Sequence, residues 1–346
     1  MAHRRINAAD LEGKIIDIHA HVGISVKAYA GLEYPYCQSL EGLYYRQKLN
    51  RVDLGVVFTY APDLYFQLPT LMDSGRMVPL EKPLAQAPYA SENRMVFKEV
   101  FDFCPELSER FLPFVVVDPV RRISEQLEVL NQLIAVYPVY GIKVVPVGCQ
   151  SKVTGLLEEG QALLDFAEHH DLPLLFHVTV DPEEGYSQVS DTFRIIERHP
   201  RLRFCLAHCV GLSRKFLERA AAADNVWVDT SALKIQVQAA YEGYRFMAPP
   251  EERYDWNYAD HTEVIRQLLE HFPDTIIWGS DSPAYSYICR RRQGEDSVSE
   301  FRLKGTYEQE KQALDCLSPP LRTRAGSTNA SAFLFGRKPI DPGSQS

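Results

Sequence analysis

The chain has 346 residues, of which 45% are hydrophobic and 24% charged, so it is long enough to bury a sizeable core. Its 37 lysines and arginines against 46 aspartates and glutamates give a formal charge of −9, which argues against a nucleic-acid backbone or an anionic membrane as the main partner. The aromatic fraction of 11% excludes disorder as the main state, because these side chains need burial.

Short apolar runs rich in β-branched residues predict eight strands in chain order. The runs are continuous rather than alternating, as expected for parallel strands covered by helices. Helix-like segments lie between most of them, at 124–136, 156–169 and, after the capping Asp260, 262–271. The predicted strands span 14–19, 52–58, 112–117, 141–145, 173–178, 203–208, 226–229 and 275–279.

This strand–helix alternation predicts an α/β fold, a closed (β/α)8 TIM barrel, and no Gly-rich nucleotide-binding motif occurs. We expect a single domain over 1–346, with its core at about 14–336 and a loose tail over the last ten or so residues. Long insertions follow strands 2, 7 and 8, on the side where barrel active sites are built. They could serve as lids, substrate loops or oligomer contacts. They span 60–93, 231–260 and 282–305.

The cysteines and the N-terminal residues bear on the cellular compartment. The seven cysteines form no CxxC pair, which indicates reduced thiols in a cytoplasmic protein. No apolar stretch approaches the ~20 residues that cross a bilayer, and polar residues follow Arg4 and Arg5, so we expect neither export nor a membrane partner. Cys205 and Cys209 flank His208, and we interpret them as small buried residues rather than as soft-metal ligands.

The strongest chemical signal is the sequence IDIHAH at 16–21, where the first predicted strand ends. Residues two apart in a strand face the same side, so His19 and His21 are expected to point together into the barrel mouth. Two converging imidazoles are hard to explain as packing, because each needs hydrogen-bond partners or a metal.

Three further predicted strands each end in a polar residue after a buried run. His177 ends strand 5, His208 ends strand 6 and Asp281 follows strand 8, all at the carboxyl edge of the barrel. With the strand-1 pair they predict a divalent metal site plus one spare acid or base. The other histidines lie at helix ends or outside the barrel and are interpreted as structural: His3, His169, His170, His199, His261 and His271.

This ordered set resembles the amidohydrolase superfamily, and within it the branch that includes aminocarboxymuconate-semialdehyde decarboxylase, the amidohydrolase 2 type. The resemblance rests on Asp-x-His-x-His at strand 1, the histidines of strands 5 and 6, and Gly-Ser-Asp-Ser-Pro at 279–283. Supporting segments are 110–113, 117–119, 141–143 and 329–335. The resemblance covers about 14–336, nearly the whole chain.

The resemblance implies one divalent metal ion, usually zinc, with His19, His21 and His177 as ligands. Asp281 would be a ligand or near-ligand that also takes a proton from the metal's water, and His208 would stay off the metal as the acid/base or electrostatic group. The chemistry is sound on general grounds, because a cation with an open position lowers the pKa of its water to about 7. A carboxylate and a histidine then assist the resulting nucleophile.

Lys143, at the end of strand 4, is open to three interpretations. A carboxylated lysine would bridge a second metal, as in binuclear relatives; a charged amine would pair with a substrate carboxylate; or the lysine would form a structural ion pair with Asp17 or Asp118. Asp17 is interpreted as orienting a ligand imidazole or closing the barrel floor. Asp229, at the end of strand 7, is interpreted as a polar loop anchor rather than a ligand.

The leading functional hypothesis is a zinc-type hydrolase that cleaves an ester, lactone or amide-like bond in a small, carboxylated metabolite. The alternative is a non-hydrolytic decarboxylase, a carbon–carbon lyase with the same metal site, in which His208 helps to protonate the carbon. A third hypothesis is a non-catalytic metal-binding barrel.

Substrate contacts are expected from the insertions, and a homodimer is suggested by analogy with relatives. Guanidinium groups pair with carboxylates through two hydrogen bonds, which makes Arg46, Arg245 and Arg290 candidate anion clamps. The candidate tyrosines are Tyr29, Tyr34, Tyr36, Tyr60, Tyr65, Tyr285 and Tyr287.

Overall fold

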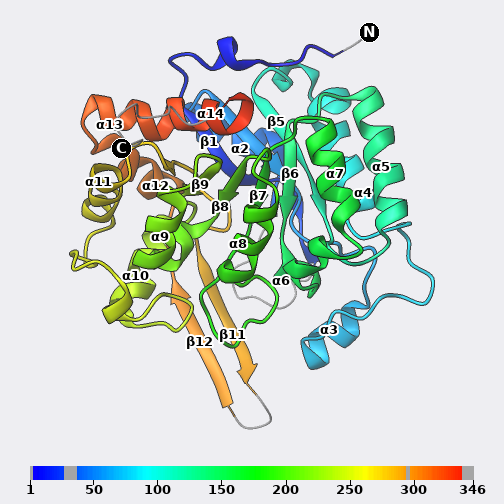
Figure 1. Cartoon of the computed structure of the whole chain (residues 1–346). Coiled ribbons are helices and arrows are strands. Elements are labelled where there is room, and N and C mark those ends of the chain that lie inside the picture. Colours follow the sequence, from blue (N-terminus) through cyan, green and yellow to red (C-terminus); the bar gives the residue numbers. More distant parts are fainter. Residues whose placement is uncertain (1–2, 27–36, 294–296, 337–346) are drawn as a thin grey trace.

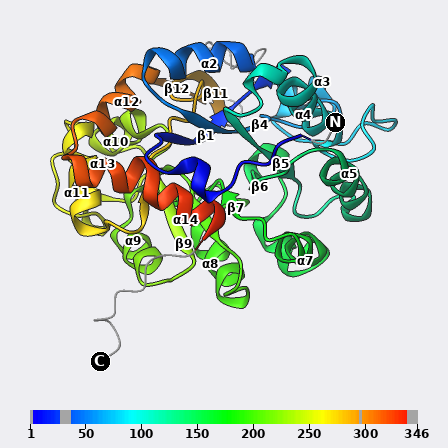
Figure 2. The ribbon, with the colours of Figure 1, turned by 90° about the horizontal axis from the view of Figure 1, so that it is seen from above.

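The computed structural model describes residues 3–26, 37–293 and 297–336. A parallel sheet of eight strands forms a barrel at the centre, and helices surround it (Figures 1 and 2). All eight predicted strands are present, mostly one to three residues shorter than predicted, so the (β/α)8 prediction is confirmed. In chain order, which is also their spatial order, they are β1 (Ile16–His21), β4 (Leu54–Phe58), β5 (Phe111–Val117), β6 (Gly141–Val144), β7 (Leu174–Phe176), β8 (Phe204–Leu206), β9 (Val226–Asp229) and β10 (Ile276–Ile277).

The barrel closes where β1 meets the segment that follows β10. The backbone N–H of His21 donates to the carbonyl of Ser282 at 2.7 Å, and the N–H of Asp281 donates to the carbonyl of His19 at 2.8 Å. These two bonds fix the end of β1 beside Asp281. Residues from opposite ends of the chain therefore share one edge of the barrel.

The helices between the strands form the outer layer (Figure 2). The predicted helices at 124–136 and 262–271 are confirmed as α5 and α11 within one residue. No helix in the described part of the chain has the length and apolar character to span a bilayer. The helices are α2 (Leu40–Leu49), α3 (Leu68–Ser74), α4 (Ala90–Lys98), α5 (Ile123–Val136), α6 (Pro146–Cys149), α7 (Gln161–His169), α8 (Val189–Arg198), α9 (Arg214–Ala221), α10 (Leu233–Glu242), α11 (His261–His271), α12 (Tyr307–Asp315), α13 (Pro319–Thr323) and α14 (Asn329–Phe335).

The predicted helix at 156–169 is wrong in its first turn. A short 3-10 helix, Val153–Leu157, precedes α7, and the chain leaves helical geometry at Glu158, with φ −127° and ψ −118°. Gly160 then passes so close to Pro119 that an added Cβ would overlap the proline carbonyl oxygen. The helix therefore begins only at Gln161, after a glycine that this close approach requires.

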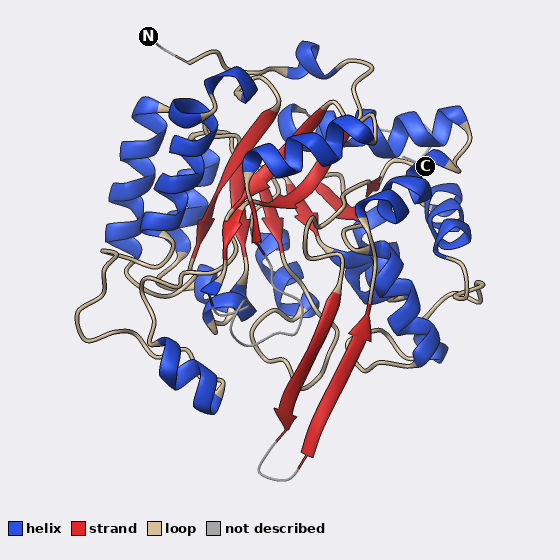
Figure 3. Ribbon diagram, turned by 180° about the vertical axis from the view of Figure 1, so that it is seen from behind, coloured by secondary structure: helices blue, strands red, loops and turns tan. Residues whose placement is uncertain are grey.

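The insertions contain regular structure rather than open loops. The first holds α3 and the start of α4, and the second holds α10. The third forms an antiparallel hairpin of β11 (Tyr287–Gln293) and β12 (Ser297–Leu303), in which Tyr287 lies opposite Leu303. Figure 3 shows this hairpin projecting beyond the barrel at the end where the barrel strands terminate. A small antiparallel pair, β2 (Gly23–Ile24) and β3 (Cys37–Gln38), follows β1, and the predicted C-terminal tail at 337–346 lies outside the described residues.

Alternation along each strand separates the barrel interior from the helix-covered surface. Inward residues such as Val116, Leu175 and Trp227 form the interior cluster, while the opposite faces of the strands pack on the helices. Lys143 sits between Val116 and Leu175 in the sheet register, so it belongs to the inward row. The polar residues after the strand ends thus rest on a close-packed apolar floor.

The cysteines behave as predicted where the structure describes their side chains. Cys205 lies in the barrel interior and Cys209 in the turn after β8, and both are fully buried among apolar residues. Among the described side chains, no disulfide includes Cys37, Cys104, Cys149, Cys205, Cys209 or Cys316.

Candidate metal centre

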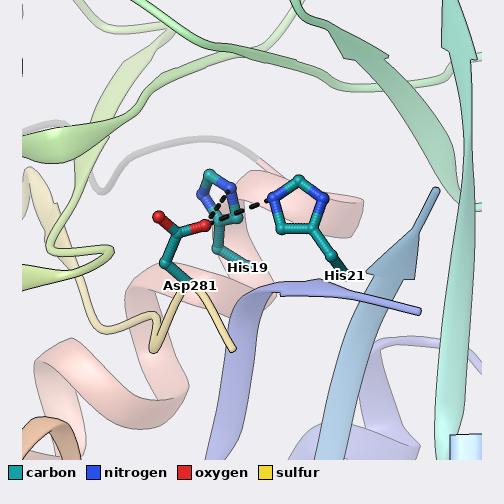
Figure 4. Close-up of side chains that lie close together, drawn as sticks. All are labelled: His19, His21 and Asp281. Carbon is teal, nitrogen blue, oxygen red and sulfur yellow. Dashed lines mark ion pairs between the residues drawn. The ribbon is translucent and has the colours of Figure 1, made fainter. Parts of the chain in front are cut away.

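Three side chains with metal-ligating atoms converge at the carboxyl edge of the barrel (Figure 4). His19 and His21 end β1, Asp281 follows β10, and one donor atom from each lies within 4.8 Å of the others. The Nε2 atoms of both imidazoles are 3.2 Å from Asp281 Oδ1. All three side chains are buried. The predicted convergence of these residues is therefore present in the fold.

Hydrogen bonds on the far side of each ring set the orientation of the two imidazoles. His19 Nδ1 donates to Asp229 Oδ2 at 2.9 Å, and His21 Nδ1 donates to the carbonyl of Thr59 at 3.2 Å. With Nδ1 protonated, a neutral imidazole presents a lone pair at Nε2. Two such lone pairs and the carboxylate of Asp281 face one another, and a cation between them relieves their repulsion.

The protonation states of this group suit metal binding. Burial and the neighbouring Lys143 together lower the pKa of His19 to about 4, against the attraction of nearby aspartates. Burial alone would raise the pKa of Asp281, but the attraction of His19 and the close contact with His21 hold it below its usual range. At neutral pH the ring of His19 is therefore neutral and the carboxylate ionised, as metal ligands must be.

His177 and His208 form a second pair in the same cavity. His208 Nε2 lies 3.0 Å from His177 Nδ1, and Ser231 contacts the other ring nitrogen of His208 through Oγ at 3.0 Å. Burial, followed by the influence of His208, lowers the pKa of His177 well below its usual value. In the described part of the chain, the compact donor group comprises the strand-1 histidines and Asp281, without His177. A ligand role for His177 stays a prediction.

Asp229 has a wider role than the loop anchor that the sequence suggested. Its Oδ1 accepts hydrogen bonds from the backbone N–H groups of Ser231 at 3.0 Å and His208 at 3.1 Å, as an anchor would. Its Oδ2 holds His19, so one carboxylate positions both histidines. Burial acts to raise the pKa of Asp229, but attraction to His19, His208 and Lys143 keeps it below the usual range. The sequence did contain a signal for this role, because Asp229 ends a predicted strand at the same edge of the barrel as the other site residues.

Lys143 points into the site rather than toward a structural partner. Its Nζ lies 3.2 Å from His19 Nε2 and 4.9 Å from the ring centre of Phe58. Burial lowers its pKa to about 8, against the attraction of nearby aspartates. In the described residues, the hydrogen bonds of Asp17 and Asp118 go to other groups, which leaves the two site-directed interpretations of Lys143.

Asp17 closes the barrel and does not touch a ligand imidazole. It accepts hydrogen bonds from Ser280 Oγ at 2.6 Å and from Tyr307 Oη at 3.0 Å, so it ties β1 to the segment after β10 and to α12. The pairing of β1 with β4 shifts register between Asp17 and Ala20, and this irregularity directs Asp17 away from the face that carries the histidines. Burial raises the pKa of Asp17 to about 6, against these hydrogen bonds. Of the two interpretations of Asp17, the structure favours the second.

The backbone that carries His208 adopts a left-handed turn. The φ angles from His208 to Leu212 run 60°, 50°, 47°, 65° and 58°, and only Gly211 adopts them without a steric penalty. Each other residue pays roughly 1–2 kcal/mol, and such strain concentrates at functional sites. Sequence patterns did not predict this turn, because one glycine does not specify a run of positive φ angles.

A cavity of about 870 Å³ opens over the candidate metal centre. Its inner end holds the site histidines, Asp281 and Lys143, and its outer end is lined by the second and third insertions and by the loop after β7. Among the predicted substrate contacts, Arg245, Tyr60 and Tyr287 line this cavity. The other candidates either lie away from it, namely Arg46, Tyr65 and Tyr285, or are outside the described residues or side chains, namely Tyr29, Tyr34, Tyr36 and Arg290.

Comparison with known proteins places the chain in a family and agrees with the barrel fold. A family model described as amidohydrolase matches residues 79–336. No match was found among curated proteins. Similar solved structures include 2,6-dihydroxybenzoate decarboxylase from Rhizobium, with TM-score 0.59 and 12% identity over 93% of this chain and 98% of that one.

Two further solved structures have similar scores. 5-Carboxyvanillate decarboxylase from Sphingomonas paucimobilis has TM-score 0.54 and 13% identity over 93% of this chain and 98% of that one. IDCase from Metarhizium anisopliae has TM-score 0.55 and 13% identity over 94% and 98%. At such identities the likeness establishes the shared barrel fold.

Proposed function

Because the chain belongs to the amidohydrolase family, we propose that it is a metal-dependent hydrolase acting on an ester, lactone or amide-like bond of a small carboxylated molecule. One observation carries this proposal. His19, His21 and Asp281 converge, with His19 neutral and Asp281 ionised, at the inner end of a cavity large enough for a substrate.

The donor set fits one divalent cation, and zinc suits this mixture of nitrogen and oxygen ligands. His19, His21 and Asp281 would hold it, with His177 as a further ligand. When bound, such a cation lowers the pKa of a water molecule and polarises a carbonyl group. A second metal would require carboxylation of Lys143, whose amine instead contacts His19.

The surrounding residues supply the proton transfers. Asp281 is ionised and accepts the proton of the attacking water, while its other contacts keep it beside the strand-1 histidines. His208 is held by Ser231 and by the anchored turn after β8, and it would stabilise the developing oxyanion once its Nε2 exchanges His177 for the substrate.

The charges of the site select an anionic substrate. A divalent cation and the ammonium of Lys143 outweigh the two carboxylates, Asp229 and Asp281, by one positive charge. A substrate carboxylate that pairs with Lys143 neutralises that excess in a water-poor site, where charge pairing is strong. We therefore assign a carboxylated small molecule, rather than a nucleic acid, as the substrate. We place the enzyme in the cytoplasm, which its free cysteines support.

Decarboxylation is the second candidate, and the position of Lys143 is the observation that favours it. A carboxylate paired with its Nζ lies beside the donor set, so the carboxyl group itself can be the reacting group. The carbon–carbon bond then breaks, carbon dioxide leaves, and His208 delivers a proton to the carbon that keeps the electron pair.

Metal analysis combined with turnover tests this proposal. The protein is purified without added metal, its metal content is measured, and it is assayed on a panel of esters, lactones, amides and carboxylic acids. One metal per chain with hydrolysis supports the proposal, whereas release of carbon dioxide without water consumption supports the second candidate. Two metals per chain would give Lys143 a bridging role. A protein that binds no metal even when it is supplied would overturn both candidates.

A further inference from the structure

We propose that the outer end of the cavity is a second subsite that binds a flat apolar group of the substrate. The proposal rests on the proposed function for the position of the acidic end of the substrate at Lys143. It narrows the substrate class to carboxylic acids that carry a ring or a comparable apolar group remote from the reacting carboxyl-derived bond. A compound with a single small ring and no such extension would leave this subsite empty.

Four aromatic side chains, here called the aromatic wall, line the outer cavity: Tyr244, Phe246, Tyr287 and Phe301. Phe301 lies in their midst, with its ring centre 5.6 Å from Tyr244, 6.4 Å from Phe246 and 5.1 Å from Tyr287. These separations are those at which aromatic rings attract one another. The wall therefore presents a ready-made surface for another flat ring.

The wall is assembled entirely from the insertions. Tyr287 and Phe301 lie on the hairpin strands β11 and β12, and Tyr244 and Phe246 follow α10. Figure 1 shows α10 and the hairpin at the same end of the molecule, and contacts between β12 and α10 join them. The subsite is thus a property of these insertions and not of the barrel strands that carry the metal centre.

Partial exposure distinguishes the wall from core packing. Rings that only pack, such as Phe114 and Trp227 in the barrel interior, are fully buried. Tyr244, Phe246 and Phe301 are each only half-buried, and all of them border the cavity. Their uncovered faces are apolar area that a ligand can remove from water, at roughly 25 cal/mol per Å².

The charged groups of the outer cavity are held by hydrogen bonds and ion pairs, and the carboxylates among them outnumber the cations. Arg245 Nε lies 3.2 Å from Asp181 Oδ2, and the same guanidinium also pairs with Glu183. Glu184 accepts hydrogen bonds from two backbone N–H groups of its own loop, and Glu300 pairs with an arginine of its own strand. The excess of carboxylates at this end repels the acidic end of a ligand, so the rings are left to contact its apolar part.

The two ends of the cavity therefore differ in chemistry. The inner end offers Lys143 and the metal-ligating group, and Tyr60 closes one side by stacking on His21 with ring centres 4.7 Å apart. The outer end offers the aromatic wall, which Ile235 and Leu303 extend. A volume of about 870 Å³ is that of a site for a ligand of many atoms. The complementary molecule is acidic at one end and apolar at the other.

Equilibrium binding to the metal-loaded protein tests the subsite without relying on turnover. The probes are benzoate, which has one ring, and biphenyl-4-carboxylate, which adds a second ring remote from the acid. Calorimetry on the wild type should show the two-ring acid binding at least about tenfold more tightly, in line with the apolar area that a second ring buries. Equal affinities, or no binding of either acid, would overturn the subsite.

Substitutions test whether the preference for the two-ring acid arises from the aromatic wall. Phe301→Ala should remove most of the preference while the affinity for benzoate changes less than about twofold. Phe103→Ala, the same change at a 62% exposed ring outside the cavity, is the matched control and should leave both affinities as in the wild type. If Phe301→Ala does not fold, as judged by circular dichroism, Tyr244→Ala replaces it. Equal weakening of both acids by the wall variant would count against the proposal.

The outcomes separate this inference from the proposed function. A preference for the two-ring acid in a protein that turns over nothing on the substrate panel would leave the subsite standing and the hydrolase proposal overturned. Hydrolysis of a compound on the panel without a preference for the two-ring acid would support the hydrolase proposal and overturn the subsite.

Discussion

The inner and outer ends of the cavity are built in different ways. The inner residues come from the ends of barrel strands, and His19, His21, Lys143 and Asp281 among them are buried. They are held by hydrogen bonds to the backbone or to other buried groups, as His19 is held by Asp229. The aromatic wall comes from the insertions, and its rings are only partly buried and contact one another as well as the hydrophobic core. The comparison indicates that the barrel fixes the chemistry and the insertions choose the molecule that undergoes it.

Removing a metal ligand should have the largest effect on activity, and it tests most directly whether the inner end of the cavity provides the chemistry. His19→Ala deletes one of the converging Nε2 donors, so bound metal should be lost and activity should fall by more than about 100-fold, the upper range even for outer-shell partners. Elemental analysis of the purified variant measures its metal content, and an assay measures its activity. His271→Ala, at an exposed helix end, is the matched control and should retain metal. Stoichiometric metal in the His19 variant would refute the assignment.

His208→Ala should separate proton transfer from metal binding at the same inner end. Since His208 lies outside the compact donor group, the variant should keep its metal and lose about 10²–10⁴-fold in kcat. Metal content and kcat are measured on the same preparation. Loss of the metal would instead make His208 a ligand and would reassign His177, its 3.0 Å neighbour, to the proton-transfer role.

Asp229→Asn tests how strongly metal binding depends on Asp229, which lies outside the donor group and orients the ring of His19. An amide in place of Oδ2 no longer accepts well from His19 Nδ1, so the ring loses its preferred tautomer. The affinity for zinc should fall by about 10–100-fold while the protein stays folded. Competition with a chromophoric chelator gives the affinity, and thermal unfolding reports on the fold. An unchanged affinity would reduce Asp229 to the loop anchor predicted from sequence.

The inner end is built from strand ends and the outer end from insertions, and this difference explains which site residues could be predicted from the sequence. The strand-end residues His19, His21, His208 and Asp281 were found because continuous apolar runs mark buried parallel strands, and a polar residue after each run marks the active edge. Asp229 met that criterion, yet its bond to His19 depends on the closed barrel and cannot be seen in local sequence.

The insertions gave much weaker signals. Their bounds were predicted, but neither the hairpin of β11 and β12 nor its aromatic wall was. Phe301 and Tyr244 come together only because two separate insertions fold against each other, which no periodicity encodes. The register shift in β1 that turns Asp17 away from the histidines is likewise a tertiary effect, because strict alternation predicts the opposite.

The smallest predicted effect concerns the support of the outer end. Glu310 of α12 is fully buried, and its Oε1 accepts a hydrogen bond from the backbone N–H of Lys234 at 3.1 Å, in the first turn of α10. Its Oε2 has no hydrogen-bond partner among the described residues. Burial raises the pKa of Glu310 well above the usual 4.5. The helix that leads to Tyr244 and Phe246 is thus anchored by a carboxyl group in a site that disfavours its charge.

The sign of the pH dependence follows from this shift. The folded state binds more protons than the unfolded state between the usual pKa of 4.5 and the raised folded value, so stability is greatest at low pH and falls as pH rises through that window. Glu310→Gln keeps an acceptor for Lys234 but cannot ionise. Chemical denaturation at about pH 8 should show the variant more stable than the wild type by about 1 kcal/mol, the lower end of the cost of a buried polar atom without a partner. Near pH 4.5 the two proteins should differ little. A variant that is less stable at both pH values would mean that the ionised carboxylate, and not merely an acceptor, holds α10 and the aromatic wall in place.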